Sequence, residues 1–225
     1  VRSLFWVAAL LGIVAIFLLL LLPAGIERPA RTRKPPLTEA FRPDLVRLDL
    51  YVFLLHGILT ASFVALPFLL TDRLDLALAD HWKLYIGSLV VSLLGTIPLV
   101  LADERQGKAW TLSVAILLMI AGQFLLAMYG TTFLQVFAAL AIFFGGFNFL
   151  EAALPARLSI RATGAVRGAS LGVFSSAQFL GAFAGGLAGG QMLGGGNPGA
   201  VFLLCAVAAA AWLALHRIGG DDEKP

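Results

Sequence analysis

The chain of 225 residues is 60% hydrophobic and only 13% charged, and its mean hydropathy is +0.92. A water-soluble globular domain cannot hide so large an apolar fraction in its interior, so the composition excludes that class. The net charge is +3, but the basic residues lie in short segments between apolar stretches rather than in a stripe with aromatic residues. No nucleic acid is therefore expected as a partner.

Seven apolar stretches are long enough to cross a hydrocarbon core about 30 Å thick as a helix. They are Leu4–Leu22, Leu45–Leu70, Trp82–Ala102, Ala109–Met128, Thr132–Leu154, Ser170–Gly190 and Ala200–Leu215. Backbone polar groups in lipid must be bonded within their own segment, so runs of this length predict helices rather than barrel strands. The predicted fold class is all-α, a polytopic membrane helix bundle with seven transmembrane helices.

Lysine and arginine are unevenly distributed between the two sets of connections. Thirteen follow the first, third, fifth and seventh spans, whereas the opposite side has three, Arg2, Arg73 and Lys83. Cytoplasmic loops accumulate positive charge. The pattern predicts an integral inner-membrane protein with the N-terminal end of this chain outside and the C-terminus in the cytoplasm.

The chain begins with Val1 rather than Met, and its first span starts almost at once, without the flanking features of a signal peptide. We therefore expect this start to be a cut within a larger protein. The segment Pro23–Asp44 contains five prolines and a basic cluster, which predicts an extended, solvated linker. It separates one span from the six that follow.

Many transporters consist of two six-helix halves joined by a long cytoplasmic connection. That organisation predicts four parts for this chain. Residues 1–22 are the last helix of the N-terminal half, 23–44 the inter-half linker, 45–218 the six-helix C-terminal half and 219–225 a cytoplasmic tail. The second, third, fifth and sixth spans are expected to line a central cavity.

The connection after the third span places an acid, a base, a glycine and a base in a tight turn, at Glu104, Arg105, Gly107 and Lys108. It resembles a loop signature of the major facilitator superfamily, with Glu where Asp is commoner and Val100 where the pattern prefers Gly. The resemblance implies a cytoplasmic gate. The alternative is a solvated loop that follows the positive-inside rule.

The stretch Phe147–Leu158 and the later Arg167–Gly190, together with His56 ahead of Phe63–Pro67, are similar to the YajR-like efflux branch of the same superfamily. This resemblance extends over nearly all of the chain from the second span onward. It implies a secondary active transporter, an antiporter that exports small, largely apolar compounds by alternating access as protons move inward. Its partners would be the substrate, protons, the lipid bilayer and the missing N-terminal half.

Glycines recur every four residues on the sixth span, at Gly181, Gly185 and Gly189. A face of small residues lets two helices approach closely. A second row consists of Gly186, Gly190 and Gly194. Such rows suit either a helix that rocks against its neighbours or static close packing.

Ionisable groups within spans are costly, so each is a functional candidate. Asp49, His56 and Thr60 lie on one face of the second span. His56, near mid-span, could carry a proton, or it could be a neutral histidine bonded between helices. Asp49 is expected to be a helix-start or gating acid. Gln178, in the middle of the sixth span, could bond a polar group of the substrate or a neighbouring helix.

On the fifth span, Asn148 and Glu151 are three residues apart and share a face, with Glu151 about a turn from the expected helix end. A buried carboxylate needs a cationic partner. We expect Glu151 to pair with Arg157, Arg161 or Arg167 in a network that closes the cytoplasmic side. The residues assigned to the substrate and proton pathway are His56, Thr60, Asn148 and Gln178.

Enzyme activity is not expected, because the sequence has no Cys/His metal cluster, no Walker-type loop and no nucleophile elbow. No cofactor or metal is expected either. The single cysteine, Cys205, can form no intrachain disulfide. Two other functions are compatible with seven spans, a seven-helix membrane receptor and a non-transporting membrane scaffold.

Overall fold

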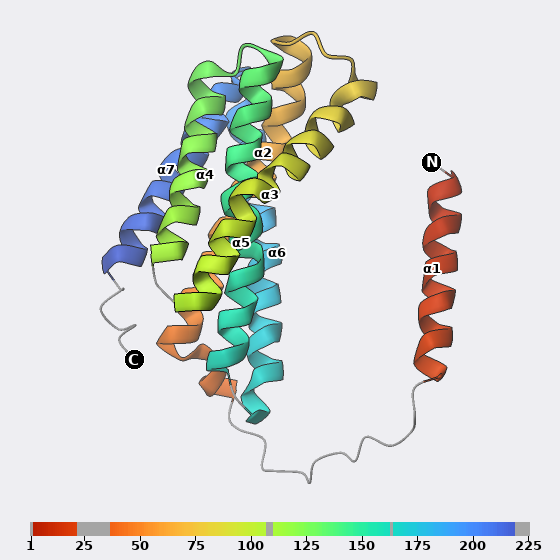
Figure 1. Ribbon diagram of the computed structural model, residues 1–225, viewed down its shortest axis with the longest axis vertical. Helices are drawn as coiled ribbons and strands as arrows, with labels where there is room; N and C mark the ends of the chain where they lie inside the picture. Colours follow the sequence, from red (N-terminus) through yellow and green to blue (C-terminus); the bar gives the residue numbers. More distant parts are fainter. Residues whose placement is uncertain (1, 22–36, 107–109, 163, 219–225) are drawn as a thin grey trace. The chain divides into compact units, whose positions relative to one another are not determined.

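The computed structural model describes residues 2–21, 37–106, 110–162 and 164–218, which form seven α-helices and three short 3-10 helices (Figure 1). The α-helices are α1 Arg2–Leu20, α2 Pro43–Asp72, α3 His81–Gln106, α4 Trp110–Tyr129, α5 Phe133–Arg161, α6 Arg167–Leu193 and α7 Pro198–Ile218. The 3-10 helices are η1 Leu37–Phe41, η2 Leu78–Asp80 and η3 Gly164–Val166. The described residues contain no strand, so the all-α prediction is confirmed.

The chain divides into two compact units, residues 1–34 and 35–225. In the first unit, α1 is apolar over Phe5–Leu20, a shorter stretch than any of the other six spans. Leu22, the predicted end of this span, lies outside the described residues. In the second unit, each of the six helices is long and apolar enough to cross a membrane, in agreement with a polytopic bundle.

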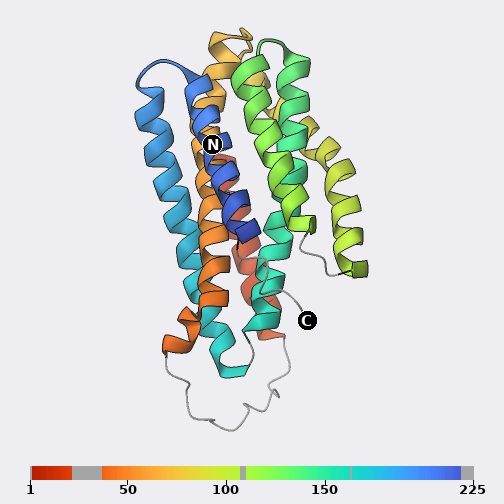
Figure 2. The same ribbon diagram turned by 90° about the vertical axis from the view of Figure 1, so that its left-hand side faces the viewer.

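The six helices of the second unit pack as neighbours around one apolar core. The helix α2 lies along α6 and α7, α4 packs between α5 and α7, and α3 lies against α5 (Figure 2). The largest fully buried side chains include Trp212, Phe143, Phe149 and Phe202. Of the six spans, α3 and α6 are the least buried. They therefore leave more of their surface for lipid or another protein segment than the central helices do.

The contact between α2 and α6 is made by backbone atoms. A Cβ built on Gly181 would overlap the carbonyl oxygen of Phe53, and one on Gly185 would overlap that of Gly57. At Gly189 an added Cβ would lie 2.9 Å from the Cα of Ala61. The prediction of close packing along this row is confirmed.

The second glycine row makes no such contact along its length. A Cβ on Gly186 would reach the Thr60 methyl group at 3.4 Å, an ordinary distance, and one on Gly190 would meet nothing within 4 Å. Only the first row therefore fixes the distance between α6 and α2.

Most helices extend a few residues beyond the expected spans, and two of these differences concern prolines. The helix α2 begins at Pro43, not after Asp44, because proline is favoured in the first turn, where its missing N–H is not needed. The helix α5 continues through Pro155 to Arg161. Pro155 lacks the N–H that would bond the carbonyl of Glu151, and the loss of that single bond does not end the helix. Glu151 is therefore far from the helix end rather than one turn from it.

Alanine substitutions should separate the two glycine rows. Gly185→Ala forces α2 and α6 apart, so we expect it to lower the free energy of unfolding by about 1–3 kcal/mol. Gly190→Ala adds a methyl group to open space in a helix and should be neutral or stabilising by up to about 1 kcal/mol. Unfolding of the detergent-solubilised chain, followed by circular dichroism, measures both. Equal effects of the two variants would contradict the backbone contact described above.

Candidate functional site

The buried imidazole of His56 lies where α2, α5 and α6 meet. Its Nε2 is 2.8 Å from Nε2 of Gln178 on α6 and 3.4 Å from Oε2 of Glu151 on α5. Its Nδ1 is 3.2 Å from the carbonyl oxygen of Val52, one turn earlier on α2. The structure thus brings together three residues singled out in the sequence, and we call His56, Glu151 and Gln178 the His56 cluster.

The helix packing explains why these side chains meet. Gln178 precedes Gly185 by seven residues, or about two turns, so it lies on the face of α6 that contacts α2. Phe147 is one turn before Glu151 on α5, and its ring packs edge-on against the imidazole with centroids 6.0 Å apart. The apolar ring covers one side of His56, which leaves Nε2 directed towards polar partners.

A pocket of about 160 Å³ adjoins the cluster. Its polar lining is Glu151, Gln178 and Ser175. The apolar lining residues are Val52, Leu55, Leu150, Leu154, Pro155, Leu171 and Phe174. Sites for drug-sized ligands usually measure about 300–1,000 Å³. This pocket can therefore hold a small apolar molecule with one polar group, or part of a larger one.

The other two residues assigned to the pathway lie apart from the cluster contacts. Asn148 donates from Nδ2 to Oγ of Ser92 at 3.0 Å, so it links α5 to α3. Thr60 is one turn after His56 and lies next to Gly186 of α6. Ser92 was not singled out in the sequence, because a serine in an apolar span has no distinguishing pattern there.

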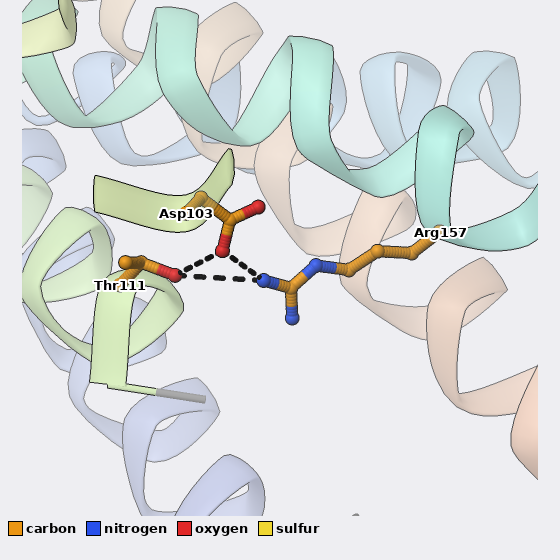
Figure 3. Close-up of polar contacts among 3 residues, drawn as sticks. All are labelled: Asp103, Thr111 and Arg157. Atoms are coloured by element: carbon orange, nitrogen blue, oxygen red, sulfur yellow. Dashed lines mark hydrogen bonds and ion pairs between the residues drawn. The ribbon is translucent and has the colours of Figure 1, made fainter. Parts of the chain in front are cut away.

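A second polar group joins the ends of α3, α4 and α5 (Figure 3). Arg157 donates to Oδ1 of Asp103 at 2.7 Å, and the Thr111 hydroxyl donates to the same oxygen at 2.6 Å. The guanidinium also lies 3.4 Å from Oγ1 of Thr111. The carboxylate of Asp103 therefore holds three helix ends together.

The structure does not show the predicted pairing of Glu151 with Arg157, Arg161 or Arg167: Oε2 of Glu151 lies 3.4 Å from Nε2 of His56, and Arg157 bonds Asp103. Six residues of helix place Arg157 about 9 Å further along α5 and about 120° round it from Glu151. The sequence interpretation chose Glu104 as the acid of the loop signature, but Glu104 is exposed and its neighbour Asp103 makes the contacts.

The remaining gate residues are placed as follows. Arg167 donates from Nε to the carbonyl of Ala162 at 3.2 Å and so braces the connection between α5 and α6. Arg161 lies in the last turn of α5, where a cation complements the helix dipole. The side chain of Arg105, and all of Gly107 and Lys108, lie outside the described residues.

Asp49 is buried on α2, two turns before His56, and its Oδ1 has no hydrogen-bond partner among the described residues. Asp49 thus differs from Asp103, whose oxygen is fully engaged.

A separate buried polar contact links α2, α4 and α7. Gln123 donates from Nε2 to the Ser62 hydroxyl at 2.7 Å, and that hydroxyl donates to the carbonyl of Ile58 at 2.6 Å. Cys205 of α7 lies 3.8 Å from the same hydroxyl. This contact links three helices of the bundle. Within the described ranges, no three His, Cys, Asp or Glu side chains are grouped as metal ligands would be.

Comparison with curated proteins finds transporters. The chain is 30% identical over 219 residues to "Inner membrane transport protein YajR" of Escherichia coli (strain K12), covering 94% of this chain and 48% of that protein. It is 26% identical over 194 residues to an "Uncharacterized transporter" of Buchnera aphidicola subsp. Acyrthosiphon pisum, covering 81% and 49%. The chain therefore spans about half the length of these relatives. No protein-family model matches it.

These relationships make the chain, over most of its length, a relative of membrane transporters. Together with six helices able to span a membrane, they support an integral membrane protein in contact with a lipid bilayer.

A double-mutant cycle should measure the Asp103–Arg157 contact. Both side chains are largely shielded, with 24% and 15% exposed, so Asp103→Asn and Arg157→Gln should show a coupling of about 1–3 kcal/mol in the free energy of unfolding. The exposed pair Arg42–Asp44, with 51% and 39% exposed, is the control and should couple by less than about 1 kcal/mol. A coupling at Asp103–Arg157 no larger than that of the control pair would show that it does not join the helix ends.

Proposed function

We propose that the chain is the C-terminal part of a secondary active transporter of the major facilitator type, which couples efflux of small, largely apolar compounds to inward proton movement. The observation that carries the proposal is the His56 cluster. The imidazole of His56, a side chain that can take up and release a proton, lies within the bundle between a carboxylate and an amide on two other helices. Ionisable groups in such positions mark proton and substrate pathways.

The geometry suits an exchange of a proton for a substrate. A proton on His56 Nε2 would be shared with Glu151 at 3.4 Å and would neutralise its charge within the bundle. After the proton leaves, Glu151 and Gln178 can bond a substrate in the adjoining pocket, which they line together with apolar side chains of other residues. Proton and substrate thus compete for the same polar groups, which is the requirement for antiport.

A cytoplasmic gate is proposed at the basic end of the bundle. Asp103 and Arg157 form its central pair, in place of a pair that includes Glu151. The other residues assigned to the gate belong in sequence to the same end of the helices or to the connections there; they are Glu104, Arg105, Gly107, Lys108, Arg161 and Arg167. The excess of arginine at that end supports a cytoplasmic location. Asp49, on the first turns of α2, lies between this end and His56 and is proposed to pass protons between them.

The proposed organisation places residues 45–218 as the six-helix half, preceded by the last helix of the other half. The division of the chain into units of residues 1–34 and 35–225 supports this arrangement. So does the length of the curated relatives, about twice that of the matched region. Alternating access would then move this half against its partner, with lipid around both.

Replacement of His56 tests the proposed function. In the full-length transporter reconstituted in liposomes, His56→Gln should flatten the pH dependence of dye efflux between about pH 5.5 and 8, because glutamine keeps a hydrogen bond to α6 but cannot take up a proton. His81→Gln is the control, since His81 begins α3 and bonds the carbonyl of Leu76 away from the cluster. An unchanged pH profile in His56→Gln would exclude His56 from coupling.

A further inference from the structure

We propose that Gln178 determines which ligands the pocket accepts, and that it does so according to the protonation state of His56. When His56 is neutral, the pocket wall presents a hydrogen-bond acceptor and selects small apolar molecules that carry an N–H or O–H donor. When His56 is protonated, that acceptor is withdrawn from the pocket and the selection is lost.

The tautomer of the imidazole follows from its neighbours. The carbonyl oxygen of Val52 can only accept a hydrogen bond, so Nδ1, 3.2 Å away, carries the hydrogen. In the neutral ring, Nε2 is then an acceptor with one lone pair. Gln178 Nε2 lies 2.8 Å from it, a normal hydrogen-bond length, whereas Glu151 Oε2 is 3.4 Å away. The amide N–H of Gln178 is thus the donor to neutral His56.

The orientation of the Gln178 amide decides which hydrogen-bonding group faces a ligand in the pocket. Gln178 lines the pocket and is half-buried. One N–H of this amide is engaged by His56, so the carbonyl oxygen Oε1 is the hydrogen-bond acceptor that Gln178 offers to a ligand. An acceptor beside a mainly apolar wall favours ligands that place a donor there, since a donor left unpaired in an apolar pocket is costly.

Protonation reverses this arrangement. Protonated His56 carries hydrogens on both nitrogens, so Nε2 can no longer accept from the Gln178 amide. Two donors then face each other at 2.8 Å. The conflict is relieved when the amide turns by 180° about its last bond and Oε1 accepts from Nε2–H. The pocket then meets the NH₂ group in place of Oε1.

The charged groups around His56 are compatible with this rotation of the Gln178 amide. Glu151 on α5 faces Nε2 and shares its added proton, α6 contributes the neutral Gln178, and α2 itself carries Asp49 seven residues earlier. The amide responds to the proton without a change in its own charge. The link to efflux rests on the proposed function, but the hydrogen-bonding change does not require transport.

A matched pair of probes tests the inference. Indole and N-methylindole differ by one N–H donor, and their binding to the full chain in lipid nanodiscs can be measured by ligand-observed NMR with empty nanodiscs as the blank. At pH 8 we expect indole to bind about threefold to tenfold more tightly, the range that one net hydrogen bond gives. At pH 5.5 the preference should disappear. Equal binding at pH 8, or the same preference at both values, would overturn the inference.

Two variants separate this role from a structural one. Gln178→Met keeps the volume but has no amide, so it should abolish the preference for indole at pH 8. It should also make His56 about threefold to tenfold harder to protonate, as read from the ¹⁵N shifts of labelled histidine, because the protonated ring loses a stronger, charge-assisted hydrogen bond to Oε1 than the neutral ring loses to the amide N–H. Gln123→Met, which removes a buried amide elsewhere, should leave the preference and the His56 titration unchanged. A Gln178→Met chain that matches wild type in both readouts would refute the role of Gln178.

The outcomes also distinguish this inference from the proposed function. A pH-dependent preference for indole combined with dye efflux insensitive to His56→Gln would retain the inference and reject proton-coupled transport. Efflux that depends on His56, without any preference for indole at pH 8, would retain proton-coupled transport and reject the inference about Gln178.

Discussion

Gly181 and Gly185 let the backbone of α6 lie directly against α2, where any added side chain would overlap the carbonyl oxygens of Phe53 and Gly57. In lipid there is little hydrophobic force between helices, so such close packing is a main source of their association. The position of α6 then fixes Gln178 beside His56. The candidate site therefore depends on residues that have no side chains.

Polar groups within the bundle have two distinct roles. The contact of Gln123 with Ser62 is buried among α2, α4 and α7, whereas the His56 cluster adjoins a pocket. Each contact gives polar groups a partner within the membrane interior, although Oε1 of Gln123 has none among the described residues. Only the second includes ionisable groups whose hydrogen bonds must change when a proton is bound, and this difference makes it the better candidate for function.

The sequence predicted the elements well and the pairings between them less well. Apolar length located six spans of the second unit, and the four-residue glycine repeat indicated the face of α6 that contacts another helix. The continuation of α5 past Pro155 was missed because proline was read as a helix end. The partners of Glu151 and Arg157 were misassigned because residues near in sequence can lie on different sides of a helix. Contacts such as Asn148 with Ser92 depend on the register between helices, which one sequence does not reveal.

The hydrogen bonds of His56 can be measured directly in the protein. A ¹⁵N NMR spectrum of histidine-labelled chain in lipid bilayers at pH 8, with His56 assigned by its loss in His56→Gln, reports which ring nitrogen carries the hydrogen. We predict that Nδ1 is protonated and bonded to the carbonyl of Val52, with Nε2 bare and accepting from Gln178. A neutral ring with its hydrogen on Nε2 would contradict the arrangement of α2, α5 and α6 proposed for the site.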